Sequence, residues 1–166
     1  MRRRGTSPGV FYAAEDPLTA AAETAWYRLR FFAASPGTPL PAGSVEHTAL
    51  AVRVATPFGI DLTGPPHDAR ADEWTDPDDY SACLALADTA RSAGIETIRY
   101  ASVRAPEARA NLAVLTCRAF ADAEPMGVQS WRIVLKPARA LVVRDFPRLT
   151  VEFRVDGKRF AYAPVA

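Results

Sequence analysis

One carboxylate is the first candidate for chemistry in this chain: Glu23, in the stretch GVFYAAEDPLTAAAETAWYRLRFF at 9–32. Apolar residues recur at helical spacing from Leu18 to Phe32, and Glu23 lies off that stripe, so packing does not demand an acid there. A carboxylate beside a sugar can oppose the positive charge that develops when a bond to the sugar carbon breaks. On spacing alone, a solvated helix surface is the better explanation of one glutamate.

The other polar candidates lie in three short segments. Tyr12 ends an aromatic run, where its ring could stack on a planar ligand. Ser102 and Arg104 lie in a predicted loop, where a hydroxyl and a guanidinium can reach a phosphate oxygen, and Asn111 opens the strand that follows. Each has a structural alternative: a core aromatic for Tyr12, a turn cap for Ser102, a surface charge for Arg104, and a loop partner for Asn111.

Local signals predict the elements that must position these side chains. The run ending at Tyr12 is typical of a buried strand, Asp16 offers an N-cap oxygen, and Pro17 suits the first helical position. A second helix is predicted from Tyr80, ended by Gly94. Further strands bring the total to seven or so, which with two helices argues for an α+β domain. They are predicted at 48–56, with 59–62 as its continuation, and at 95–100, 111–115, 128–135, 140–144 and 149–155, the last followed by an Asp156-Gly157 hairpin.

The acidic segment at 64–79 is the place where a metal site would be sought. It holds His67 and six acids, but these acids do not follow a calcium-loop spacing and lack its turn glycine. We therefore expect a solvated loop and no bound metal. Cys83 and Cys117 also lack ligand spacing, and they fit small core residues in a reducing compartment.

Composition narrows the class of protein. Hydrophobic residues make up 49% of the 166 residues and charged residues 23%, which is enough apolar material for one domain with a proper core. The net charge of +1 lacks the basic excess of a general nucleic-acid binder, so no direct nucleic-acid partner is expected. No apolar run reaches the length of a membrane span, and we predict a cytoplasmic protein.

Two strings in the chain resemble the two halves of a RES domain, the toxin of RES-Xre type toxin-antitoxin pairs. The first is 9–32, where a strand ending in Tyr12 leads through a small-residue turn to an Ala-rich helix with Glu23 eleven residues after the Tyr. The second, YSACLALADTARSAGIETIRYASVRAPEARANLAVL, shows a helix, a Gly-Ile turn, a Tyr-x-Ser-x-Arg loop and an Asn opening the next strand. The resemblance implies an ADP-ribosyltransferase-like fold with mixed and antiparallel sheets and two main helices.

The resemblance also implies a reaction and its residues. RES domains degrade NAD+ at the nicotinamide–ribose bond, so NAD+ is a substrate, inorganic phosphate or water is the acceptor, and no resident cofactor is expected. Glu23 and Ser102 would be catalytic, while Tyr12, Arg104 and Asn111 would bind NAD+. The family places a key Arg ten to twelve positions before the strand Tyr. In this chain only the run 2–4 is available, so Arg2 is assigned as catalytic and Arg3 and Arg4 as binding residues.

The front of the chain is where it departs from the family pattern. We expect residues 1–166 to form a single RES-like domain that lacks the N-terminal segments of the family. Two alternatives stay open: a truncated, inactive RES fold that binds an Xre-type antitoxin, and an ADP-ribosyltransferase that modifies a macromolecule. Uncovered sheet edges could be masked by a partner chain or by a homodimer.

Overall fold

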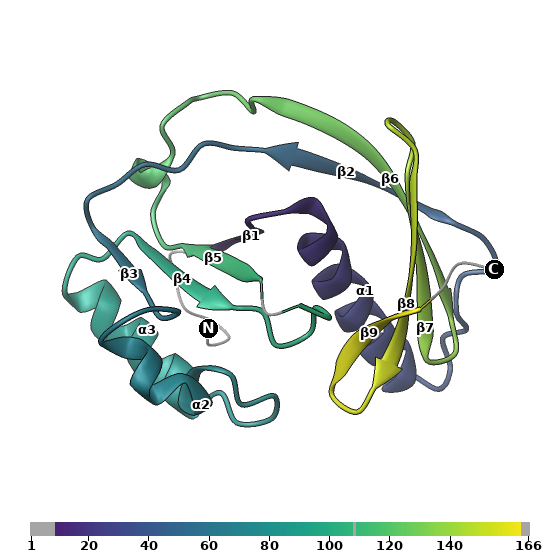
Figure 1. Cartoon of the computed structure of the whole chain (residues 1–166), viewed down its shortest axis with the longest axis horizontal. Coiled ribbons are helices and arrows are strands. Elements are labelled where there is room, and N and C mark those ends of the chain that lie inside the picture. Colours follow the sequence, from purple (N-terminus) through teal and green to yellow (C-terminus); the bar gives the residue numbers. More distant parts are fainter. Residues whose placement is uncertain (1–8, 108, 164–166) are drawn as a thin grey trace.

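The computed structural model describes residues 9–107 and 109–163, and it has the α+β architecture that the sequence predicts. Two sheets share the long helix α1 (Pro17–Ala33), which contacts strands of both (Figure 1). The first sheet has the order β1-β5-β4-β3, in which β3 runs parallel to β4 and the other pairs are antiparallel. The second sheet has the order β2-β6-β7-β8-β9 and is antiparallel throughout.

The remaining elements have the following bounds. The strands of the first sheet are β1 (Phe11–Ala14), β3 (Gly59–Asp61), β4 (Thr97–Ala101) and β5 (Ala110–Val114). Those of the second sheet are β2 (Val45–Ala51), β6 (Gly127–Lys136), β7 (Arg139–Arg144), β8 (Leu149–Asp156) and β9 (Arg159–Ala163). The other helical segments are η1 (His67–Arg70), α2 (Ala71–Trp74), α3 (Ser81–Ser92) and η2 (Cys117–Ala119).

The start of α1 forms as its sequence dictates. The backbone N–H of Thr19 donates to Asp16 Oδ1 at 3.0 Å, and Pro17 occupies the first turn, where a missing N–H breaks no intrahelical bond. Ala22 and Ala25 are fully buried, and Trp26 packs edge-to-face on Phe160 of β9 with ring centroids 5.2 Å apart. This contact fixes α1 against the second sheet and leaves Glu23 on the side of the helix toward the first sheet.

Two predicted elements differ from the structure because their sheet partners are distant in sequence. The strand expected at 48–56 is β2, which begins at Val45, ends at Ala51 and leaves the Leu50 side chain 53% exposed. Residues 59–62 do not continue it: β3 pairs with β4 in the other sheet. An alternating pattern gives the period of a strand, but neither its sheet nor which face is covered.

The acidic segment at 64–79 is not an irregular loop, as the sequence suggested, because it contains η1 and α2. Trp74 anchors it: the ring is buried and its Nε1 donates to the His67 carbonyl at 3.1 Å. Nearby, Cys83 is buried as expected, whereas Cys117 is exposed, so its assignment to the core was wrong. Within the described residues no group of three or more His, Cys, Asp or Glu side chains could hold a metal ion.

Candidate functional site

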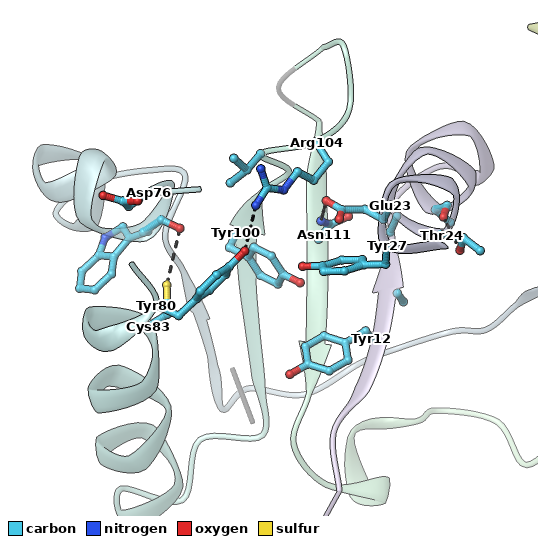
Figure 2. Close-up of a pocket in the computed structure, with 15 residues that line it drawn as sticks. Tyr12, Glu23, Thr24, Tyr27, Asp76, Tyr80, Cys83, Tyr100, Arg104 and Asn111 are labelled. Atoms are coloured by element: carbon cyan, nitrogen blue, oxygen red, sulfur yellow. Dashed lines mark hydrogen bonds between the residues drawn. The ribbon is translucent and has the colours of Figure 1, made fainter. Parts of the chain in front are cut away.

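A cavity of about 460 Å³ lies between α1, the first sheet and the segment that leads into α3. Figure 2 shows side chains entering it from both sides, with Glu23 and Tyr27 from α1 facing Tyr80 from the start of α3. Its size suits a small organic ligand. It is lined by Tyr12, Ala13, Ala14, Ala20, Glu23, Thr24, Tyr27, Trp74, Asp76, Tyr80, Cys83, Tyr100, Val103, Arg104 and Asn111.

The Glu23 carboxylate is held in one orientation by two donors from the first sheet. Ser102 Oγ donates to Glu23 Oε1 at 2.6 Å, and Asn111 Nδ2 donates to the same oxygen at 2.9 Å. No hydrogen bond from the described residues reaches the second oxygen, Oε2. The half-buried carboxylate therefore presents a fixed negative charge with one oxygen left for a ligand.

Ser102 lies behind this carboxylate and does not line the cavity. It follows β4 directly, is only 6% exposed, and its Oγ also accepts the backbone N–H of Ala105 at 3.1 Å. The hydroxyl thus donates one hydrogen bond to Glu23 and accepts another within its own loop. In this arrangement Ser102 positions the carboxylate.

Asn111 comes from β5, the strand between β1 and β4, where it is paired with Ala14 and Tyr100. The side chain is buried, and because Nδ2 donates to Glu23, the orientation of the amide is fixed. Its Oδ1 has no hydrogen-bond partner among the residues that the structure describes. A buried acceptor without a partner is costly, so a water or a ligand donor would satisfy it here.

Arg104 is buried and makes no ion pair with a carboxylate of the described residues. Its Nη2 donates to the Pro77 carbonyl at 2.6 Å and to the Tyr80 hydroxyl at 2.9 Å, and Nη1 donates to the Lys158 carbonyl. The guanidinium also stacks over the Trp26 ring at 5.0 Å from its centroid. This cation adds positive potential on its own side of the cavity, which Glu23 and Asp76 also line with carboxylates, so an anionic group of a ligand is favoured beside Arg104.

Four tyrosines form the aromatic part of the cavity. Tyr12, Tyr27 and Tyr80 are exposed, at 46%, 56% and 39%, and Tyr100 is half-buried; all four line the cavity (Figure 2). Loss of solvation, with the charges of its neighbours, raises the pKa of Tyr27 to about 12, and desolvation together with the nearby Glu23 carboxylate raises the pKa of Tyr100 as well. These hydroxyls stay neutral at physiological pH, so they can donate hydrogen bonds.

Three of these tyrosines were not among the site residues predicted from the sequence. Tyr27 could have been found, because it follows Glu23 by four residues and such pairs share a helix face. Tyr100 lies on β4, two residues before Ser102, and residues at this spacing along an extended chain point to the same side. Tyr80 gave no signal, since its place depends on how the 64–79 segment folds against β4.

The predicted residues thus fall into three groups. Glu23, Tyr12, Arg104 and Asn111 line the same cavity, and Ser102 contacts it through Glu23. The three arginines assigned to the front of the site, Arg2, Arg3 and Arg4, lie outside the described residues.

None of the helices in the described part of the chain has the length and apolar character needed to cross a bilayer.

The fold is thus an α+β domain with a carboxylate fixed at the wall of a cavity of small-ligand size. The comparison with protein families identifies which family of α+β domains this is. The RES domain model matches residues 1–136, so the chain belongs to the RES domain family. RES domains generally act on NAD+, and the match is consistent with a toxin-antitoxin-type, NAD-related domain. No curated protein matches the chain.

Proposed function

We propose that this protein degrades NAD+ by breaking the bond between nicotinamide and ribose. The observation that carries the proposal is the Glu23 carboxylate, fixed by Ser102 and Asn111 at the wall of the aromatic cavity. Family membership supports NAD+ as the substrate class.

The chemistry follows from the charges involved. When the glycosidic bond breaks, its electron pair goes to the nicotinamide nitrogen, the ring leaves neutral, and positive charge develops on the ribose. The free oxygen of Glu23 can hold a ribose hydroxyl and oppose that charge, which stabilises the transition state more than the ground state. The oxygen of water or phosphate then bonds to the ribose carbon, and with water the surplus proton passes to solvent.

The cavity residues supply binding and orientation. An aromatic face such as that of Tyr12 can stack on the nicotinamide ring, and the positive potential of Arg104 favours the diphosphate. The neutral hydroxyls of Tyr27 and Tyr100 can donate hydrogen bonds to the substrate. Arg2 would supply a catalytic cation, with Arg3 and Arg4 binding the diphosphate beside it.

In the cell, we propose that the protein is the toxin of a RES-Xre pair, acting in the cytoplasm and inhibited by an Xre-type antitoxin. A small antitoxin encoded beside it should suppress the growth arrest that its expression causes. If no neighbouring protein restores growth, the pairing is wrong.

Free nicotinamide is the product that tests the enzymatic proposal. Purified protein is mixed with NAD+, with and without inorganic phosphate, and nicotinamide is followed by chromatography. Release that needs phosphate identifies a phosphorylase, and release in its absence a glycohydrolase. Transfer of ADP-ribose to added protein or nucleic acid identifies an ADP-ribosyltransferase, and no release from a folded sample indicates an inactive RES fold that serves as a binding module.

A further inference from the structure

The hairpin formed by β8 and β9 lies outside the residues that the family model matches, which end at 136, yet it contacts Arg104, a residue that lines the cavity. Its turn forms as Asp156-Gly157 predicts, with Gly157 at φ +60°, a conformation that favours glycine. The next residue, Lys158, makes two contacts with the wall of the cavity.

The first contact is made by the backbone. The Lys158 carbonyl accepts a hydrogen bond from Arg104 Nη1, and two residues later the Phe160 N–H donates to the Arg104 carbonyl at 2.9 Å. Phe160 also packs on Trp26, the ring beneath the Arg104 guanidinium. The hairpin therefore fixes both the backbone and the side chain of Arg104.

The second contact is made by the side chain. The Lys158 ammonium pairs with the Asp78 carboxylate, across 80 residues of sequence. Asp78 belongs to the turn at 76–80, which forms one wall of the cavity through Asp76 and Tyr80. Asp76 Oδ1 accepts the N–H groups of Asp78 and Asp79, at 2.8 and 2.9 Å, and these bonds hold the turn together.

The same turn is also held from inside the cavity, because Arg104 donates to the Pro77 carbonyl and to the Tyr80 hydroxyl. Lys158 thus contacts the turn directly through Asp78 and indirectly through Arg104. These are the two connections by which the hairpin can set the distance between Tyr80 and the Glu23 side of the cavity.

We propose that Lys158 is a positioning residue for this cavity, latching the 76–80 turn through Asp78 while its carbonyl holds Arg104. The inference rests on the proposed function only for its effect on catalysis, since the latch itself is a property of the fold. Both partners are more than half exposed, at 61% for Lys158 and 56% for Asp78, so the pair is a latch that salt can weaken.

Charge reversal and charge exchange test the latch. In Lys158→Glu the two carboxylates repel, and amide hydrogen exchange at Asp78, Asp79 and Ser81 should rise about five-fold to ten-fold, the range that an exposed pair can produce when it is inverted. In the double variant Asp78→Lys with Lys158→Glu the two charges are swapped, so hydrogen exchange at the amides of the turn should return to within about two-fold of the wild-type rate. The control is Arg159→Glu, which reverses a charge on the adjacent residue and should leave these amides unchanged.

The same variants are then assayed for nicotinamide release. Lys158→Glu should raise KM for NAD+ about five-fold with little change in kcat, and 0.5 M NaCl should narrow the gap to wild type. The latch is wrong if the charge-swapped double variant shows the same hydrogen exchange and KM as Lys158→Glu. It is also wrong if Arg159→Glu has the same effects as Lys158→Glu. A wild-type protein without nicotinamide release would overturn the proposed function alone, because hydrogen exchange still decides the latch.

Discussion

Glu23 and Ser102 lie 79 residues apart in the sequence, and the Ser102 hydroxyl donates to the Glu23 carboxylate at 2.6 Å. The pair joins α1 to the loop that follows β4, so it depends on how the helix docks on the first sheet. Because a carboxylate can only accept, the Ser102 hydroxyl is the donor in this pair, and its oxygen accepts the Ala105 N–H. Loop and helix thereby fix the carboxylate together.

The negative charge of Glu23 should be essential, and a side chain of the same shape without it should not suffice. In Glu23→Gln the side chain keeps an oxygen that can accept from Ser102 and Asn111, so the fold should be retained. Loss of the negative charge should lower kcat for nicotinamide release by about 100-fold to 1,000-fold, as removal of a transition-state contact does. Nicotinamide assays with circular dichroism as the control for folding check this, and near-normal turnover would exclude Glu23 from the reaction.

Removal of the Ser102 hydroxyl should lower both activity and stability, with the larger effect on activity. In Ser102→Ala the buried Ala105 N–H loses its acceptor, which costs about 1–3 kcal/mol of unfolding free energy. Glu23 also loses its shorter hydrogen bond, so its carboxylate becomes mobile and kcat should fall more than KM rises. Urea unfolding and steady-state kinetics separate the two effects. A loss of stability without a loss in kcat would leave Ser102 a purely structural role.

Much of this site follows from local sequence signals, and the rest does not. The predicted helix start, helix end and hairpin are confirmed at Asp16-Pro17, Gly94 and Asp156-Gly157, because a cap or a turn depends on a few neighbouring residues. The sequence did not predict that Tyr80 lines the cavity, because its position depends on contacts with Arg104, which is distant in sequence. Sheet assignment failed at 59–62 for the same reason, since the partner strand β4 lies some forty residues further along the chain.

A second carboxylate beside Glu23 should shift the pH dependence of the reaction. Asn111 Nδ2 lies 2.9 Å from Glu23 Oε1, so Asn111→Asp brings two carboxylates together, and repulsion raises the pKa of the pair. Activity should then be lost at low pH and return only as pH rises, so that the acid limb of the kcat profile moves upward. Asn111→Ala is the control, because it weakens activity without adding a charge. If the kcat profiles of Asn111→Asp and Asn111→Ala fall off at the same acidic pH, the carboxylates at 23 and 111 do not interact.

Tyr27 should make the fold sensitive to alkali. Loss of solvation, with the neighbouring Tyr80 and Glu23, raises its pKa in the folded protein to about 12, against an ordinary value of 10.0. Because 56% of Tyr27 is exposed, solvent screens part of this effect, and its contribution to stability is small. Between these values the unfolded chain has released the proton and the folded chain has kept it, so rising pH favours unfolding. Stability from this group is therefore complete below pH 10 and is lost as pH rises toward 12. Tyr27→Phe removes the titrating group, so from pH 8 to pH 11 the urea midpoint should fall less in this variant than in wild type. An equal fall in both proteins would show that the Tyr27 hydroxyl is not desolvated in the cavity.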